Sequence, residues 1–544
     1  MSQKIKICLA QINLLVGDID GNINRIIQAA ETARDELSAR IIVFPELTVT
    51  GYPPEDLLLR EDFLRSASIA MSRLTDHIKG ICCVIGCPVR LDDRLHNAAV
   101  VIDSGRELAR YYKQALPNYN VFDEARYFVA GNQPTVFSLE GTRFGVTICE
   151  DVWEPLPVQA SVGVGAEIIL NLNASPFDMH KSSEREDRVV GALAKKYQIP
   201  IVYTNLVGGQ DELVFDGCSF VVDNKGVVVH RSIAFEESLS TVSIGRDGNG
   251  IISVHGTQKV KLPGLEARIY QALVTGVRDY IEKNGFKGVV LGLSGGIDSA
   301  LTLAIAVDAL GADRVEAVTM PSRFTRDISI EDALLECEWL GVTCHQINIE
   351  PMFESFLTAL NPVLNDYAPD TTEENIQARC RGVLLMAISN KTGNIVLTTG
   401  NKSEMAVGYA TLYGDMAGGF AAIKDVPKTL VYRLARYRNE QAMAIPERVI
   451  DRAPSAELAH DQKDEDSLPP YDILDAILQA YVEEDQSVSE IIRRGFNADE
   501  VSRVVKMVIR NEYKRRQAPP GVRITKRAFG RDRRYPLTSG YTYM

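Results

Sequence analysis

The sequence predicts two α/β domains in series: a layered domain with both sheet faces covered, followed by a doubly wound parallel sheet. Three observations support this fold class. The chain has 544 residues, more than one hydrophobic core usually serves. Short apolar runs alternate with helical patterns along both halves, as in strand–helix–strand units. In the second half, a strand-like run passes through a glycine-rich turn into a helix at Val289–Val307.

The composition indicates a globular protein of the cytoplasm. Hydrophobic residues make up 45% and charged residues 24% of the chain. No apolar run approaches the roughly 20 residues of a membrane span, and the N-terminus begins directly with a strand pattern, so we expect neither a signal peptide nor a membrane partner. The nine cysteines show no zinc-binding spacing and are expected to be reduced. The net charge of −13 argues against nucleic acid as a partner.

The first half begins with a strand over Ile5–Leu14, a helix over Asn22–Leu37 and a buried strand over Arg40–Phe44. Similar units recur to about residue 235, with a hairpin over Ser219–Arg231. A stretch rich in Ser, Gly and charged residues then precedes a helix that starts near Leu265. We therefore predict one domain over residues 1–258 and a second over residues 259–544.

Three residues of the first half have complementary chemistry. Glu46 follows a buried strand in VFPEL, Lys113 lies in RYYKQ, and Cys149 ends the strand FGVTIC. A thiol needs a base to become a nucleophile, and acyl transfer needs positive charge where the oxyanion develops. Glu46, Lys113 and Cys149 would supply the base, the oxyanion partner and the nucleophile.

The segments Phe-Pro-Glu46-Leu, Tyr-Lys113 and Ile-Cys149-Glu-Asp resemble the carbon–nitrogen hydrolase (nitrilase) family. This resemblance implies an αββα sandwich and a Glu–Lys–Cys catalytic triad that forms a thioester with an amide substrate. Glu124 is expected to assist the base. The segment LNASPFDMHKSSERED resembles the glutamine-specific branch. Contacts with glutamine are then implied for Tyr119, Ser175 and Lys181.

The strand–turn–helix of the second half is suited to phosphate. Adjacent glycines let backbone N–H groups approach a ligand, and a helix N-terminus favours anionic oxygens. No lysine follows the glycines as it would in a Walker loop. Ser294, Ser299 and Asp298 instead suit a pyrophosphate with its Mg²⁺. The alternative is an ordinary turn in which Asp298 and Ser299 cap the helix.

The SGGIDS turn resembles the ATP-pyrophosphatase (PP-loop) family, whose members cleave ATP to AMP and pyrophosphate while they adenylate a substrate. ATP contacts are implied for Gly292, Leu293, Ser294, Gly295, Gly296, Ile297, Asp298, Ser299 and Thr399.

Further strands are expected over Val315–Met320 and Thr343–Ile347, with a helix over Ile328–Leu340 and another capped by Thr372. The strand in IVLTTG leads into Thr399–Glu404. Since ligands lie beyond the carboxyl ends of strands in such sheets, this segment and the SGGIDS turn should meet. Asp298 and Glu404 would then share a Mg²⁺.

The segments ENIQAR, TTGNKSEMAVGYATLYGD and EYKRRQAPPG…AFGRDRRYP resemble the NAD⁺ synthetase family, and with the first half the whole chain is similar to its glutamine-dependent branch. This resemblance implies contacts with deamido-NAD⁺ at Asn375, Glu404 and Lys514. It also implies that ammonia released from glutamine amidates deamido-NAD⁺ through an adenylated intermediate. The enzyme is expected to be a homo-oligomer.

Two other functions are compatible with the residues. One is an amidotransferase that uses the same two modules on a different carboxylate. The other is a binding protein that senses ATP and NAD and carries an inactive hydrolase domain. The complete set of Glu46, Lys113 and Cys149 argues against this second alternative, because a sensor has no use for all three.

Overall fold

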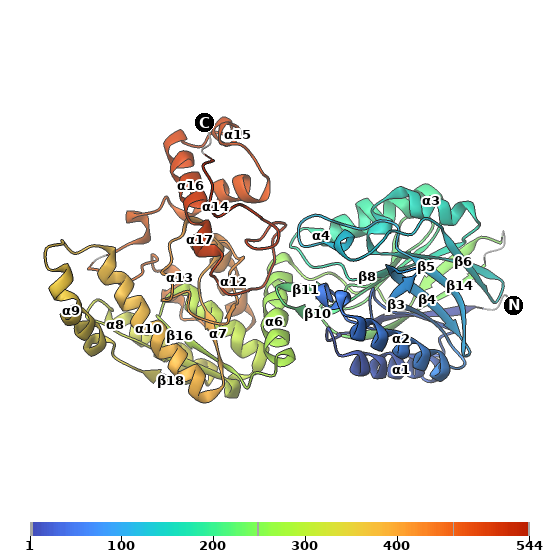
Figure 1. Cartoon of the computed structure of the whole chain (residues 1–544), viewed down its shortest axis with the longest axis horizontal. Helices are drawn as coiled ribbons and strands as arrows, with labels where there is room; N and C mark the ends of the chain where they lie inside the picture. Colours follow the sequence, from blue (N-terminus) through green and yellow to red (C-terminus); the bar gives the residue numbers. More distant parts are fainter. Residues whose placement is uncertain (1–3, 247–249, 461, 542–544) are drawn as a thin grey trace. The chain divides into compact units, whose positions relative to one another are not determined.

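The protein folds into two compact units, Met1–Pro263 and Gly264–Met544 (Figure 1). The structure is a computed structural model that describes residues 4–246, 250–460 and 462–541. Each unit has its own sheets and its own hydrophobic core. Among the described residues, no helix combines the length and the apolar character needed to cross a membrane.

The first unit contains two large sheets and a two-stranded ribbon. The first sheet has the strand order β15-β14-β1-β2-β3-β4-β5. Its strands are β1 (Ile5–Gln11), β2 (Ile41–Val43), β3 (Cys82–Leu91), β4 (Arg94–Asp103), β5 (Arg106–Tyr112), β14 (Ser238–Arg246) and β15 (Ile252–Gly256). The second, ordered β13-β12-β9-β8-β7-β6, contains β6 (Thr135–Leu139), β7 (Thr142–Ile148), β8 (Ile168–Asn173), β9 (Ile201–Asn205), β12 (Phe220–Val222) and β13 (Val228–Arg231). The ribbon pairs β10 (Val207–Gln210) with β11 (Leu213–Asp216).

Side chains of β1 show how these sheets are layered. Ile7 and Leu9 belong to a core shared with Val146 and Leu170 of the second sheet, whereas Cys8 points the other way. Since successive side chains of a strand face opposite sides, the first sheet has two buried faces. Its outer face is covered by α1 (Ile19–Asp35) and α2 (Glu61–His77), and that of the second sheet by α3 (Pro155–Gly163) and α5 (Ala192–Tyr197). The predicted αββα sandwich is confirmed.

The second unit contains a parallel sheet with the order β18-β17-β16-β19-β20. Its strands are β16 (Val289–Gly292), β17 (Val315–Thr319), β18 (Thr343–Gln346), β19 (Ile395–Thr398) and β20 (Phe420–Ala421). The strand order reverses between β16 and β19, which is where ligands bind in doubly wound sheets. The predicted doubly wound fold is therefore confirmed.

Helices accompany this sheet and continue beyond it. They are α6 (Leu265–Lys283), α7 (Ile297–Leu310), α8 (Asp327–Leu340), α9 (Glu350–Leu364), α10 (Thr371–Thr392), α11 (Lys402–Val407), α12 (Lys428–Gln441) and α13 (Glu447–Asp451). The last helices are α14 (Tyr471–Leu478), α15 (Val488–Arg493), α16 (Ala498–Arg510) and α17 (Glu512–Arg515). The first three share a core with part of α11, and α17 contacts α11 and α16. The last helices therefore pack directly against a segment that borders the ligand-binding edge of the sheet.

Two helix starts differ from the sequence-based expectation. The apolar periodicity after the SGGIDS turn predicts a helix from Ala300, but α7 begins at Ile297, so that Asp298 and Ser299 lie in its first turn. The predicted cap Thr372 of α10 is wrong, because Asp370 caps this helix: its side chain accepts from Thr372 N while Glu373 reaches back to Asp370 N. A capping box needs its acceptor three residues before the glutamate, and Thr372 is only one residue away.

Candidate active sites

Glu46, Lys113 and Cys149 each follow the end of a strand in the first unit. Glu46 comes after β2, Lys113 directly after β5 and Cys149 directly after β7. The Lys113 Nζ lies 2.6 Å from Glu46 Oε1, and both side chains are fully buried. Cys149 is only 4% exposed. The structure thus brings the predicted base and the predicted oxyanion partner into direct contact.

The carboxylate of Glu46 is fixed in orientation by one donor from β4 and one from the residue after β8. Asn97 Nδ2 donates to its Oε1 at 2.8 Å, and the backbone N–H of Ala174 donates to its Oε2 at 3.2 Å. With Lys113, these contacts occupy both oxygens of a group that would otherwise bear a costly buried charge. The carboxylate is thereby held in one orientation.

Cys149 stands on a strained turn. Its φ of +41° lies in the left-handed region, which a residue with a side chain rarely adopts. Asp151 stabilises this turn, since its carboxylate accepts from Ile148 N at 2.9 Å and from Ala115 N at 2.8 Å. Burial raises the pKa of Asp151 to about 6. The same carboxylate therefore ties the cysteine turn to the segment that follows Lys113.

The resting thiol of Cys149 is protonated. Burial raises its pKa well above the usual value, and the charge of Glu46 adds to this rise, while Lys113 and Lys181 oppose it. A thiol in this state attacks a carbonyl only if a base removes its proton as the bond forms. The buried carboxylate of Glu46 is suited to this task.

Glu124 is a second carboxylate that contacts the ammonium group of Lys113. Lys113 Nζ lies 2.8 Å from each of its oxygens, and Tyr52 OH donates to Oε1 at 3.2 Å. Burial raises the pKa of Glu124 to about 7, although the charge of Lys113 opposes the shift. Burial also lowers the pKa of Lys113, but Glu124 and Glu46 together raise it well above its usual value. Lys113 is therefore a permanent cation.

The residues expected to contact glutamine lie near this triad. Tyr119 OH donates to Glu150, the neighbour of Cys149, at 2.7 Å. Ser175 follows Ala174, and its N–H donates to Asn205 Oδ1 at 2.9 Å. Lys181 opens α4 (Lys181–Ser183), with its Nζ 5.6 Å from the Trp153 ring centroid. Tyr119 therefore contacts the neighbour of Cys149, Ser175 adjoins a residue that contacts Glu46, and the charge of Lys181 acts on Cys149.

The second site is a cavity of about 300 Å³ at the switch point of the parallel sheet. Its lining includes all of Gly292–Ser299, together with Thr399 and Glu404. Gly295 has a φ of +76°, and a Cβ there would stand 2.1 Å from the carbonyl oxygen of Ser329. Only glycine fits this close approach. The turn itself is closed by the hydroxyls of Ser294 and Ser299, which lie 3.0 Å apart.

Lys428, at the start of α12, is a central residue of this cavity that the sequence did not reveal. Its Nζ forms a short ion pair with Asp298 and lies 3.4 Å from Glu404 Oε1. Burial lowers the pKa of Lys428, but Asp298 and Glu404 raise it more strongly. Burial raises the pKa of Glu404 to about 8, against the charge of Lys428. The two predicted metal ligands therefore converge on one buried cation.

Other cavity residues escaped the sequence analysis because no motif marks them. Arg452 Nη2 donates to the Gly295 carbonyl and to Asp332, both at 2.8 Å, and so braces the phosphate loop. Arg381 and Asp464 also line the cavity. Each comes from a segment distant from the glycine turn, so only the folded chain shows that they meet.

Asn375 and Lys514 do not line this cavity in the described part of the chain. Asn375 Oδ1 accepts from Thr411 Oγ1 at 2.7 Å, and Lys514 Nζ donates to the carbonyls of Gly408 and Ala410 at 2.8 Å. Glu404 adjoins the same segment, because its carbonyl accepts from Tyr409 N at 3.0 Å. The three residues expected to bind deamido-NAD⁺ thus surround residues 408–411.

Comparisons with known proteins agree with this division. A carbon-nitrogen hydrolase family model matches residues 6–249, and an NAD synthase model matches residues 269–518. The glutamine-dependent NAD(+) synthetase of Acinetobacter baylyi is 49% identical, over 99% of each chain. The solved structure of the Acinetobacter baumannii glutamine-dependent NAD+ synthetase in complex with ADP is 46% identical, covers 100% of both chains and has a TM-score of 0.81. A Cytophaga hutchinsonii structure with a TM-score of 0.83 is 24% identical and supports the fold.

Proposed function

The chain belongs to the glutamine-dependent NAD⁺ synthetases, and from this premise we propose that it amidates deamido-NAD⁺ to NAD⁺ with ammonia released from glutamine. ATP drives the reaction and leaves as AMP and pyrophosphate. The observation that carries this proposal is that one chain contains both a buried Glu46–Lys113–Cys149 site and a cavity built on the SGGIDS turn. We assign glutamine cleavage to residues 1–258 and amidation to residues 259–544.

Glutamine cleavage follows from the geometry of the first site. Glu46 takes the proton of the Cys149 thiol as the sulfur attacks the amide carbon. Lys113, fixed 2.6 Å from Glu46, stabilises the oxyanion of the tetrahedral intermediate. Glu46 returns the proton to the leaving nitrogen, so that ammonia departs and a thioester stays on Cys149. Water then hydrolyses the thioester to glutamate. Tyr119, Ser175 and Lys181 are proposed to hold the substrate.

Amidation needs activation, because a carboxylate is a poor electrophile. We assign ATP to Gly292–Ser299 and Thr399, and deamido-NAD⁺ to Asn375, Glu404 and Lys514. A carboxylate oxygen of deamido-NAD⁺ attacks the α-phosphorus of ATP, and pyrophosphate leaves. Ammonia attacks the acyl carbon of this adenylate, and AMP leaves with NAD⁺. Lys428 is positioned to neutralise charge that develops on the phosphates.

The donor set of the second site fits a Mg²⁺ that arrives with ATP. Such ions are usually bound by one or two carboxylates and by phosphate oxygens. Asp298 and Glu404 supply two carboxylates beside the phosphate loop. The described residues contain no group of three or more His, Cys, Asp or Glu side chains that would hold a metal without a substrate. Bound there, Mg²⁺ would neutralise the pyrophosphate leaving group.

The paired assay that tests the proposal supplies Mg·ATP and deamido-NAD⁺ with either glutamine or ammonium. Equal amounts of AMP, pyrophosphate and NAD⁺ are expected with either nitrogen donor, and an equal amount of glutamate with glutamine. If neither donor yields NAD⁺, the acceptor is a different carboxylate. The enzyme is proposed to work in the cytoplasm, where its nine cysteines, all free thiols in the structure, stay reduced.

The raised pKa of Glu124 predicts the acidic limit of glutamine cleavage. Below its pKa of about 7 this carboxyl binds a proton and withdraws one negative charge from Lys113. We expect kcat/KM for glutamine to fall as the pH drops through 7. In Glu124→Gln this inflection should disappear, with activity at pH 8 about tenfold lower. Glutamate release is measured from pH 5.5 to 9 in the wild type and in Glu124→Gln. An unchanged inflection in the variant would show that another group titrates.

An exposed apolar face on α9 and α10 supports the proposed homo-oligomer. Val363 and Val383 are 72% and 66% exposed, and Phe356 and Met386 are also accessible. Such a face is usually covered by a partner. We expect Val383→Glu to lower the molar mass measured by light scattering, whereas Ile69→Glu, at an exposed site in the first unit, should not. A monomeric wild type, or a Val383→Glu variant of wild-type mass, would contradict this interface.

A further inference from the structure

The short helix α11 and its cap contact the cavity on one side and other parts of the second unit on the other. Asn401, its cap, donates from Nδ2 to Asp298 Oδ1 at 2.9 Å, and Glu404 reaches Lys428. Lys402 and Ser403, between them, are held by the rest of the second unit. A helix of six residues has little stability of its own. The positions of Asn401 and Glu404 therefore depend on what holds Lys402 and Ser403.

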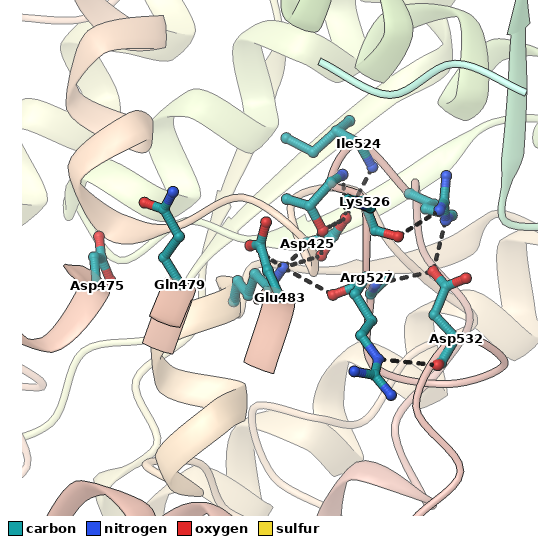
Figure 2. A network of polar contacts seen from close by, with 12 residues as sticks. Asp425, Asp475, Gln479, Glu483, Ile524, Lys526, Arg527 and Asp532 are labelled. Atoms are coloured by element: carbon teal, nitrogen blue, oxygen red, sulfur yellow. Dashed lines mark hydrogen bonds and ion pairs between the residues drawn. The ribbon is translucent and has the colours of Figure 1, made fainter. Parts of the chain in front are cut away.

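Lys402 is held by four oxygen acceptors. Its Nζ lies 2.7 Å from Glu483 Oε1, 2.7 Å from Thr525 Oγ1, 2.9 Å from Asp425 Oδ1 and 3.2 Å from the Arg527 carbonyl. The lysine is 3% exposed. Figure 2 shows Asp425, Glu483 and Arg527 converging from separate segments. We call these four acceptors the lysine cage.

Half of the lysine cage comes from the basic C-terminal segment. Asp425 Oδ2 accepts from the N–H groups of Ile524 and Thr525 at 2.9 and 2.7 Å, which docks this segment onto the loop before α12. The C-terminal segment is itself closed by an ion pair of 2.6 Å between Arg523 and Asp532. The resemblance implies a deamido-NAD⁺ contact for Lys514 of this basic stretch, whereas the Thr525 hydroxyl and the Arg527 carbonyl help to enclose a lysine.

Lys402 is unsuited to direct chemistry. It does not line the cavity among the described residues. Burial lowers its pKa, but Asp425 and Glu483 raise it above the usual value, so it stays an ammonium ion. An ammonium group with three donors satisfies several acceptors at once and fixes the helix start in one place. Its contribution is thus to geometry.

Asp475 of α14 provides a second anchor next to the cage. Ser403 Oγ donates to Asp475 in a short hydrogen bond, and the same carboxylate accepts from Thr429 N at 2.9 Å. Ser403 Oγ also accepts from the backbone N–H of Lys428 at 2.9 Å. Helices α11 and α12 are therefore joined at their N-terminal turns, which carry Glu404 and Lys428 of the cavity.

We propose that Lys402 is a positioning residue for amidation, and that the C-terminal segment 523–532 acts on the active site by completing its cage. This inference rests on the proposed function of the second site. Through Asn401 and Glu404, the cage sets the separation of the two carboxylates that would face Mg²⁺. A small displacement there should weaken the use of Mg·ATP without affecting glutamine cleavage.

Thr525→Val removes one acceptor of the lysine cage and keeps the size of the side chain, so it is the milder test. Thr525→Ser, which keeps the hydroxyl, is the matched control. AMP formation is measured with ammonium over a Mg²⁺ titration. In Thr525→Val we expect the half-saturating Mg²⁺ concentration to rise roughly three- to tenfold, with the rate recovering at high Mg²⁺. Thr525→Ser should behave like the wild type.

Lys402→Met gives the stronger form of the test. We expect roughly a 30-fold loss of AMP formation with glutamine cleavage retained. Wild-type Mg²⁺ dependence in Thr525→Val would overturn the proposal even if Lys402→Met fails to fold. So would a loss of total activity that extra Mg²⁺ does not restore, since this indicates only a smaller folded fraction. A wild type that forms no AMP would instead refute the proposed function.

Discussion

Replacing Cys149 with alanine is expected to abolish NAD⁺ formation from glutamine and to leave formation from ammonium near the wild-type rate. Removal of a catalytic nucleophile typically costs at least about 10⁴-fold, because neighbouring groups act only through it. The cavity on the SGGIDS turn contains no part of Cys149, so its chemistry should persist when ammonia is supplied. Glutamate, AMP and NAD⁺ are measured with each donor.

Cys87→Ala is the matched control. Cys87 is also a fully buried thiol of the first unit, and burial raises its pKa to about 12, but it is not part of the Glu46–Lys113–Cys149 set. This variant should keep both activities. Residual glutamine-driven synthesis in Cys149→Ala would show that a different residue cleaves glutamine. Loss of ammonium-driven synthesis would show that the two sites are not separable.

Replacing Lys428 with methionine is expected to impair amidation and to spare glutamine cleavage, the reverse of the effect expected for Cys149→Ala. AMP and NAD⁺ formation should fall by about 10³-fold with either donor, as when a preorganised charge is removed from a transition state. Glutamine cleavage should continue. The physical reason is that Asp298, Glu404 and Asp464 all raise the pKa of Lys428, so it is the positive charge around which the acidic side of the cavity is arranged.

Lys391→Met, at an exposed position on α10, controls for the loss of a lysine and should be neutral. Thermal unfolding of Lys428→Met separates a catalytic loss from a folding loss, since the variant leaves buried carboxylates without their partner. AMP formation at the wild-type rate in a folded Lys428→Met protein would exclude the lysine from amidation.

The sequence predicted the first site better than the second for a physical reason. Glu46, Lys113 and Cys149 each stand just beyond a strand of strongly apolar residues, so strand recognition places them at sheet ends. The phosphate loop was recognisable in the same way. Lys428 has no such marker, because it approaches Asp298 only through the packing of α12 against α7. Long-range packing of this kind leaves no local pattern.

The residues assigned by resemblance to deamido-NAD⁺ illustrate a further difficulty. Periodicity could place Asn375 and Lys514 on helices, but it could not show that both would contact residues 408–411. Likewise, the sequence EYKRRQAPPG…AFGRDRRYP does not show which groups its arginines contact. In the structure, Arg515 and Arg533 both pair with Glu512. A charged residue in a sequence indicates that its side chain has a polar partner, but it does not identify that partner.

The placement of Lys113 between the carboxyl groups of Glu46 and Glu124 also bears on where protons go during glutamine cleavage. Lys113 Nζ lies 2.6 Å from Glu46 and 2.8 Å from Glu124, and these three side chains form an enclosed set. In the proposed mechanism the thiol proton passes to Glu46 and then to the departing nitrogen, so the enclosed set regains its starting charge once ammonia has left. No proton is drawn from bulk water in this half-reaction. The product is consequently released as neutral NH₃ rather than as ammonium, and only the neutral form has the lone pair that attacks an acyl-adenylate.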